Sequence, residues 1–252
     1  MDLPLDGVTV LVTRAGEHLS AAALFEALGA RVDVAPVIAI GPPPKDSGLQ
    51  EAVRDADSFD WIVFTSASGV EAFARCRRAF PAKVRTAVVG AATSDALQET
   101  FKRRPDVVPE RFVSEELAEA LRKAAKPGAA ILIVQAQDAR PVLASRLKEA
   151  GFLVTAVAGY STLETPPPDL PARVAAAGAI VLASASAVRS LVRGLGSGAP
   201  VLLRDKVIAC IGPITAGQAK ELGIRVDVVP DKSTMKAMAQ ALCRFYEKKN
   251  RG

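Results

Sequence analysis

Four short segments of this sequence combine hydroxyl side chains with small residues, directly after apolar runs and directly before helical patterns. Ser and Thr at such positions can cap a helix, and the free amides of a helix N-terminus attract carboxylates or phosphates. Capping alone explains any one segment, but four equivalent segments exceed what capping requires and predict an anion-binding site. The segments are 65–68, 90–93, 184–186 and 212–215, and their substrate-binding candidates are Ser66, Ser68, Thr93, Ser184, Ser186 and Thr215.

Three further residues follow apolar runs in the same way. Thr13 and Arg14 come directly after the run 8–12, and we predict both as substrate-binding residues. A guanidinium at the end of a strand can form a bidentate pair with a carboxylate, although a surface salt bridge is the other reading. Tyr160 follows the run 152–157. Its phenol could donate a proton or a hydrogen bond to a leaving group, or merely pack against its neighbours, and the residues leave both readings open.

Motifs for several other chemistries are absent. No Gly-x-Gly-x-x-Gly follows the first apolar run and no Walker sequence occurs, so dinucleotide and ATP binding lack their usual support. His18 is the only histidine, and Cys76, Cys210 and Cys243 are scattered. They offer neither a metal-ligand set nor a Ser-His-Asp triad. We therefore expect reduced thiols, no metal, and neither triad-based nor metal-dependent hydrolysis.

The composition is that of a globular protein with a packed core. Hydrophobic residues make up 50% of the 252 residues and charged residues 23%, and the net charge of +5 favours acidic partners. Aromatic residues make up only 5%, which disfavours a platform for single-stranded nucleic acid. The first residues do not read as a secretory signal, and no apolar stretch is long enough to span a bilayer. We expect a cytoplasmic protein with no nucleic-acid or membrane partner.

The elements that must position these side chains alternate between short β-branched runs and Ala/Leu/Glu-rich helical segments. This alternation predicts an α/β fold with parallel sheets flanked by helices. A helix is expected at 20–28, ended by Gly29. Strands are expected at 8–12, 61–65, 86–89, 106–108, 130–134, 152–157, 179–183, 207–211 and 226–229, with a longer extended segment at 32–40.

The second half of the sequence repeats the first. Glu26 and Lys148 begin similar segments 122 residues apart, and the same spacing relates the segments that begin at Val89 and Ile211. Asp-Val-Val-Pro occurs at 106–109 and again at 227–230. A duplicated α/β unit places equivalent loops around one ligand, so we predict two similar lobes with a ligand cleft between them.

Two proline-rich stretches, 41–44 and 165–168, lie at equivalent places after extended segments. Proline ends a strand and stiffens the chain that follows. We interpret the segments before them as a two-stranded connector that the chain crosses once in each direction. The predicted first lobe is therefore discontinuous, comprising 1–35 and 166–252. The second lobe is 41–158, and the connectors are 36–40 and 159–165.

The sequence resembles the uroporphyrinogen-III synthase family over nearly its whole length. The resemblance rests on four segments: Leu-Val-Thr-Arg at 11–14, Asp-Trp-Ile-Val-Phe-Thr-Ser-Ala at 60–67, the stretch 151–162 with its Tyr-Ser-Thr, and Ala-Cys-Ile-Gly-Pro-Ile-Thr-Ala at 209–216. It implies two α/β lobes with a two-stranded connector and the substrate in the cleft. It also implies a monomeric, cofactor-independent lyase of heme biosynthesis.

The reaction that the resemblance implies is the closure of hydroxymethylbilane, a linear tetrapyrrole with eight carboxylates, to uroporphyrinogen III. Water is lost and the last pyrrole ring is inverted through a spiro intermediate. By the resemblance Tyr160 is a catalytic residue that assists departure of the hydroxyl. Ser66, Thr93, Ser184 and Thr215 match hydroxyl positions that face the cleft, and Thr234 is a weaker match. A transient handoff of substrate from hydroxymethylbilane synthase is expected, because hydroxymethylbilane is unstable.

Several positions depart from the family pattern. Gln135-Ala136 stands where an Arg-Gly pair is common, so that either a carboxylate contact is missing there or Arg140 supplies it. Ala15 and Ala183 stand where a proline and a threonine are frequent. These departures keep open an alternative, a weakened or inactive two-lobed relative that binds a polycarboxylate tetrapyrrole. A third reading, an α/β nucleotide-sugar or cofactor enzyme, is disfavoured by the missing glycine fingerprint.

Overall fold

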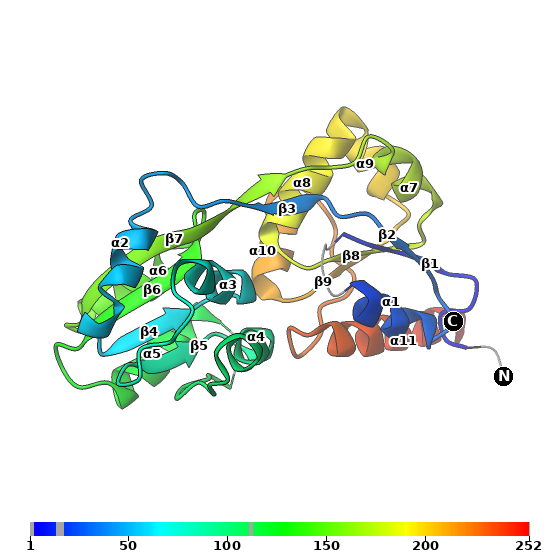
Figure 1. Ribbon diagram of the computed structural model, residues 1–252. Helices are drawn as coiled ribbons and strands as arrows, with labels where there is room; N and C mark the ends of the chain where they lie inside the picture. Colours follow the sequence, from blue (N-terminus) through cyan, green and yellow to red (C-terminus); the bar gives the residue numbers. More distant parts are fainter. Residues whose placement is uncertain (1–2, 14–17, 111–112, 252) are drawn as a thin grey trace. The chain divides into compact units, whose positions relative to one another are not determined.

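The computed structural model describes residues 3–13, 18–110 and 113–251, and the chain divides into two compact units (Figure 1). Unit 1 comprises Met1–Ala39 and Leu163–Gly252, and unit 2 comprises Ile40–Thr162. The chain passes from one unit to the other twice, once within strand β3 (Ile38–Gly41) and once within the long strand β7 (Leu153–Glu164).

Unit 1 is built on a four-stranded parallel sheet with the order β2-β1-β8-β9. Its strands are β1 (Thr9–Val12), β2 (Arg31–Val34), β8 (Ala179–Leu182) and β9 (Val207–Cys210). Strands β1, β8 and β9 are almost wholly buried, as expected of a parallel sheet covered on both faces. Alternate residues face opposite sides: Leu11 packs in one core, while Val10 and Val12 pack in the other.

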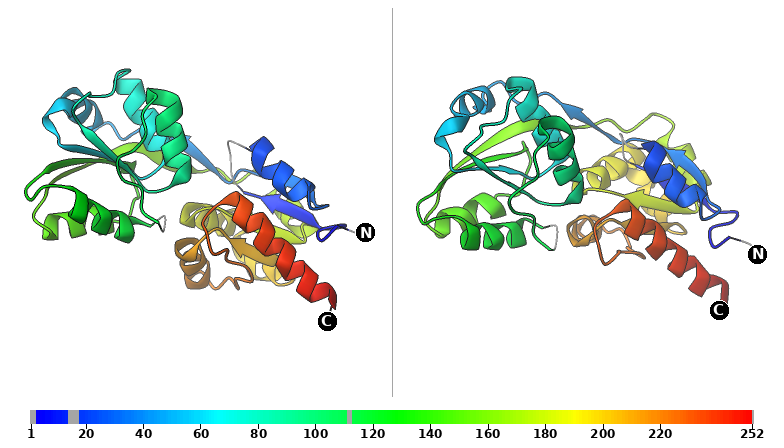
Figure 2. Two further views of the ribbon diagram at one scale, coloured as in Figure 1. Left: turned by 90° about the horizontal axis from the view of Figure 1, so that it is seen from below. Right: turned by 60° about the horizontal axis from the view of Figure 1, so that its bottom comes forward.

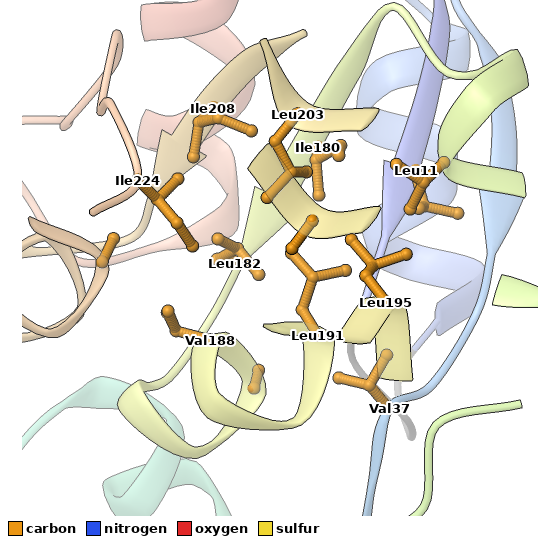
Figure 3. Packing of buried hydrophobic residues seen from close by; sticks show 14 of the residues in the cluster. Leu11, Val37, Ile180, Leu182, Val188, Leu191, Leu195, Leu203, Ile208 and Ile224 are labelled. Carbon is orange, nitrogen blue, oxygen red and sulfur yellow. The ribbon is translucent and has the colours of Figure 1, made fainter. Parts of the chain in front are cut away.

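Helices cover both faces of this sheet. One core joins the sheet to α7 (Leu170–Ala176), α8 (Ala185–Leu195), α9 (Ala199–Leu203) and α10 (Pro213–Glu221). Figure 3 shows this core, with Leu11, Ile180 and Ile208 of the strands near Leu191 of α8 and Leu203 of α9. The other core lies under α1 (His18–Glu26) and α11 (Met235–Arg251), which lie side by side in both views of Figure 2.

Unit 2 repeats this arrangement around the order β3-β7-β6-β4-β5, in which β7, β6, β4 and β5 are parallel. The additional strands are β4 (Trp61–Phe64), β5 (Arg85–Val88) and β6 (Ala130–Ala136). One core packs the sheet against α2 (Leu49–Arg54), α3 (Ala67–Cys76) and α4 (Ala91–Phe101). The other packs it against α5 (Ser114–Ala124) and α6 (Val142–Glu149). Short 3-10 helices occupy Ala56–Ser58 and Gly196–Gly198.

The two sheets have the same strand order, since β2-β1-β8-β9 of unit 1 corresponds to β7-β6-β4-β5 of unit 2. In each unit one isolated parallel bridge adds a further segment beside the last strand of this order. Val228 pairs with Ala209 of β9, and Val107 pairs with Ala87 of β5. The prediction of an α/β protein with two similar units, each a parallel sheet flanked by helices, is therefore confirmed.

Two details of the predicted strands differ from the structure. The extended segment expected at 32–40 is split into β2 and β3, with Pro36 in the gap; proline has no amide hydrogen for a ladder. The strands expected at 106–108 and 226–229 are reduced to the isolated bridges at Val107 and Val228. In both cases an aspartate side chain replaces part of the ladder: Asp106 accepts from Thr86 N and Asp227 from Ile208 N.

Candidate functional site

The strand order places most of the predicted site residues just after the carboxyl ends of two neighbouring strands in each unit. In unit 1 the chain leaves β1 toward β2 and leaves β8 toward β9, so the two connections diverge from neighbouring strands. The connections after β6 and β4 diverge in the same way in unit 2. In open parallel sheets, ligands bind at the carboxyl ends of the strands where such a divergence occurs. Each unit therefore has one such edge.

Two serines, one in each unit, begin the helices at these edges with the same geometry. Ser66 precedes α3, and its Oγ accepts a hydrogen bond from Gly69 N at 3.2 Å. Ser184 precedes α8, and its Oγ accepts one from Ala187 N at 3.1 Å. Both serines are half-buried, as are Ser68 and Ser186 in the first turns of these helices. Each edge thus presents hydroxyls and first-turn amides that are not fully covered.

Thr93 and Thr215 form a second matched pair, in the first turns of α4 and α10. Each residue is only 4% exposed, so its hydroxyl lies at the covered side of the helix start. Each helix follows an extended glycine, Gly90 or Gly212. At Gly212 a Cβ would lie 2.6 Å from Ser233 Oγ, so a larger residue there would require the Ser233 hydroxyl to turn away.

Thr13 and Arg14 differ from the other predicted residues. Thr13 is fully buried, and its Oγ1 donates a hydrogen bond to Val181 O at 2.8 Å, which ties the end of β1 to β8. Its hydroxyl is therefore already used within unit 1, and a direct contact with substrate stays a prediction. Arg14 lies outside the described residues. In unit 2, Arg140 pairs with Glu115 at 3.1 Å, so its guanidinium is engaged within the unit.

Tyr160 lies on β7 opposite Ala136, the last residue of β6. Its phenol donates a hydrogen bond to Ser66 Oγ at 2.9 Å, and its side chain is 7% exposed. Burial raises the pKa of Tyr160, the hydrogen bond to Ser66 opposes that rise, and the charge of Asp138 adds to it. The phenol is therefore protonated at neutral pH and available as a hydrogen-bond donor.

A β-bulge turns Tyr160 toward Ser66. Gln135 pairs with Ala158 and Ala136 pairs with Tyr160, which leaves Gly159 as an extra residue on β7. Val157 and Tyr160 are three residues apart, and in a regular strand they would face opposite sides of the sheet. The extra residue places Tyr160 on the same face as Val157. A Cβ on Gly159 would lie 2.8 Å from Val134 Cγ1 and 3.2 Å from Ala72 Cβ, so the bulge requires glycine.

The sequence patterns predicted Tyr160 and Ser66 separately but missed that they form one pair. They also missed Ser190, whose fully buried hydroxyl donates to Val37 O and holds the segment before β3 against α8. The only sequence signal for the Tyr160 pair is a glycine next to the tyrosine in a β-branched run, which is a common mark of a bulge. Nothing in the sequence marks Ser190, because its partner is a backbone carbonyl 153 residues away.

Among the described residues, no three His, Cys, Asp or Glu side chains are grouped so that they could hold a metal ion. Within the same part of the chain, no helix is long and apolar enough to cross a membrane.

Comparisons with known proteins place this chain in a family. The family model for uroporphyrinogen-III synthase HemD matches residues 20–240. A chain from Methanothermobacter thermautotrophicus, provisionally assigned to the same enzyme, is 32% identical over 92% of this chain and 96% of its own length. The uroporphyrinogen-III synthase of Synechococcus elongatus is 30% identical over 95% of this chain and 96% of its own.

Solved structures agree at the level of the fold. A mutant uroporphyrinogen-III synthase from Thermus thermophilus superposes with a TM-score of 0.62 at 22% identity, covering 96% of this chain and all of that one. The enzyme from Helicobacter pylori gives the same TM-score at 13% identity, over 94% and 99% of the two chains. The resemblance drawn from the sequence is confirmed by the family match and by the relatives, and the chain belongs to the uroporphyrinogen-III synthase family.

Proposed function

We propose that this chain is a lyase that closes hydroxymethylbilane to uroporphyrinogen III with loss of water, and that it needs no cofactor. The observation that carries the proposal is the repeated set of hydroxyls at the strand ends of both units, in a chain of this family. The set comprises Ser66, Ser68 and Thr93 in unit 2 and Ser184, Ser186 and Thr215 in unit 1. In both units these residues lie in or directly before the first turn of a helix.

The chemistry of this set suits a polycarboxylate. First-turn amides and hydroxyls donate hydrogen bonds, and a helix N-terminus carries about half a positive charge, so each helix start can hold a carboxylate without a dedicated lysine or arginine. Hydroxymethylbilane has eight carboxylates, which matches several modest sites better than one strong site. Thr93 and Thr215 support this reading, because each places a hydroxyl in the first turn of a helix that follows a strand of the sheet.

The catalytic task is mainly to hold one conformation of a flexible chain. The hydroxyl on the first ring leaves, the last ring attacks to form a spiro intermediate, and closure follows with that ring inverted. Because ring closure without the enzyme produces the type I isomer, control of geometry decides the product. Tyr160, protonated and held at the edge of unit 2, is the residue we propose to assist departure of the hydroxyl. Thr13 and Arg14 complete the proposed substrate-binding set.

The test is to add the purified chain to hydroxymethylbilane generated in situ, to oxidise the products, and to separate type I from type III uroporphyrin by chromatography. Predominantly type III product, without added metal or cofactor, is expected. Type I alone at the spontaneous rate would contradict the proposal. Tight binding of the tetrapyrrole without turnover would instead favour the inactive relative that the departures at Gln135, Ala136 and Ala183 suggest.

We further propose that the protein acts as a cytoplasmic monomer that receives its substrate by transient handoff from hydroxymethylbilane synthase. The reason is chemical, since the open-chain substrate closes spontaneously once it is released. Light scattering tests the monomer, and fractionation of cells tests the location. The handoff is tested in an assay that couples hydroxymethylbilane synthase to this protein. A competitor that consumes free hydroxymethylbilane but binds neither enzyme is added in increasing amounts. Direct transfer makes the type III yield insensitive to that competitor.

A further inference from the structure

The hydroxyl of Ser66 has a defined set of partners in unit 2. Its oxygen accepts one hydrogen bond from Gly69 N at 3.2 Å and a second from the Tyr160 hydroxyl at 2.9 Å. A serine hydroxyl has two acceptor lone pairs and one donor hydrogen. Both lone pairs are therefore used, and no described residue accepts the remaining Ser66 hydrogen. That hydrogen is the one free donor of the pair.

Burial distinguishes the two side chains. Tyr160 is 7% exposed, whereas Ser66 is only half-buried at the start of α3. The phenol comes from β7, where Tyr160 pairs with the last residue of β6, and it donates its hydrogen to the more exposed serine oxygen. A ligand at this edge of the sheet therefore meets the Ser66 hydroxyl before it meets the phenol.

Unit 1 has the same cap serine without the phenol. Ser184 Oγ accepts from Ala187 N at 3.1 Å, as Ser66 Oγ does from Gly69 N, and both precede a helix after an inner strand of the sheet. In the described part of the chain no side chain donates to Ser184 Oγ. The phenol is thus a feature of one unit added to a cap that both units share, and capping does not require it.

We propose that Ser66 is the catalytic residue that donates its proton to the departing hydroxyl of the substrate, and that Tyr160 is a positioning residue that acts through Ser66. This inference rests on the proposed function and deepens it. The phenol orients the serine, polarises its O–H bond by donating to the same oxygen, and resupplies the proton. Tyr160 does not need to touch the substrate in order to influence the rate.

The step balances as follows. The bond between the hydroxymethyl carbon and its oxygen breaks, and the electron pair stays on oxygen, which takes the Ser66 proton and leaves as water. The Ser66 oxygen takes the Tyr160 proton. The pyrrole nitrogen supplies the electrons for the new exocyclic double bond and releases its N–H proton, which returns through water to the phenol. Substrate becomes azafulvene and water, and both side chains are restored.

The pKa of Tyr160 fits this role. Burial raises that pKa above its ordinary value, so the phenol stays protonated throughout the neutral range. Because burial disfavours a phenolate, the pyrrole N–H proton must reach the phenol oxygen as the phenol gives up its own proton, so that no buried phenolate accumulates. The Asp138 charge acts in the same direction as burial.

The test combines Tyr160→Phe with Ser66→Ala in one double-mutant cycle and with Ser184→Ala in a second. In each cycle kcat and KM for type III formation are measured. Tyr160→Phe and Ser66→Ala are each expected to lower kcat roughly 100-fold, the lower end of the range for a single proton donor. The double variant is expected to have the kcat of Ser66→Ala alone, because the phenol acts only through the serine. Ser66→Thr keeps a hydroxyl and a helix cap, and it is expected to recover most of kcat.

Ser184→Ala is the matched control, since it removes the same cap hydroxyl from the other unit. It is expected to act mainly on KM, and its effect is expected to multiply with that of Tyr160→Phe. If Ser66→Ala does not fold, Ser66→Gly removes the hydroxyl at a smaller cost to the cap. Circular dichroism and melting temperature confirm the fold of every variant.

Two outcomes separate the inference from the proposed function. If the unmodified protein forms only type I product, the proposed function fails and the cycle is not reached. If it forms type III but Tyr160→Phe lowers kcat by the same factor with and without Ser66, the phenol acts directly and the inference is overturned. Equal kcat values for Ser66→Ala and Ser184→Ala would overturn it as well.

Discussion

The carboxylate of Asp106 accepts two hydrogen bonds from Thr86, one from the backbone N at 2.8 Å and one from Oγ1 at 3.3 Å. Thr86 is fully buried in β5, and the aspartate substitutes for the missing ladder partner at the edge of the sheet. The same device occurs in unit 1, where Asp227 accepts from Ile208 N at 2.9 Å. The repeated Asp-Val-Val-Pro segments therefore have a structural role in both units.

We predict that Asp106→Ala lowers the free energy of unfolding by about 1–3 kcal/mol, because it leaves the buried Thr86 amide without its acceptor. Urea unfolding followed by fluorescence of Trp61, the only tryptophan and a buried residue of β4, measures the change in unit 2. Asp57→Ala is the control. Asp57 pairs with Arg77 at 2.7 Å but is 67% exposed, so its loss should cost about 1 kcal/mol or less. Equal losses for both variants would contradict the assignment.

Gly159→Ala is expected to damage stability and activity together. The new Cβ would meet Val134 Cγ1 at 2.8 Å, which forces β7 to shift and moves Tyr160 away from Ser66. Overpacking of this kind costs about 1–3 kcal/mol. The expected result is a lower melting temperature and a kcat close to that of Tyr160→Phe.

Gly217→Ala provides the comparison for this variant. Gly217 lies within α10, and an added Cβ would meet nothing within 4 Å. Because alanine favours helix more than glycine does, a gain of about 0.5–1 kcal/mol is expected. A Gly159→Ala variant with unchanged melting temperature and kcat would show that β7 tolerates the bulge without glycine.

Thr93→Val and Thr215→Val test the two first-turn threonine hydroxyls. Valine keeps the shape of threonine and removes only the hydroxyl, so stability should change by no more than one hydrogen bond contributes, about 0.5–1.5 kcal/mol. A hydrogen bond from each hydroxyl to a substrate carboxylate would contribute about 1.5 kcal/mol, which corresponds to a roughly tenfold rise in KM. Thr→Ser at the same positions should restore KM. A KM unchanged in both valine variants would remove these residues from the substrate-binding set.

Cys210 predicts a loss of stability at alkaline pH. Burial in β9 raises the pKa of its thiol from 9.0 to about 11. Because the folded-state pKa lies above the unfolded one, the contribution to stability is complete below pH 9 and is lost between about pH 9 and pH 11. The loss should approach roughly 3 kcal/mol, because each unit of pKa shift corresponds to about 1.4 kcal/mol. Urea unfolding followed by circular dichroism, compared with Cys210→Ala at each pH, isolates this thiol, and parallel pH curves for the two proteins would contradict the prediction.

Much of the architecture follows from local patterns. β-branched runs such as 61–64 and 207–210 are long enough for buried strands, and the helical segments between them carry apolar residues that cover both faces of a parallel sheet. The spacing of 122 residues between repeated segments indicates two units with the same strand order. Because the hydroxyl segments directly follow strands, their place at the carboxyl edges could also be predicted from the sequence.

The pairing of Tyr160 with Ser66 was decided only by the tertiary structure. The two residues are 94 positions apart, and the regular alternation of a strand does not foresee the extra residue at Gly159 that turns the phenol toward α3. Likewise, the buried bonds of Thr13 and Ser190 end on backbone carbonyls, which carry no sequence signal. The sequence by itself determined which elements form and which side chains follow them. Register and packing decided which of those side chains meet, because a single bulge or a distant carbonyl changes the partner without changing the pattern.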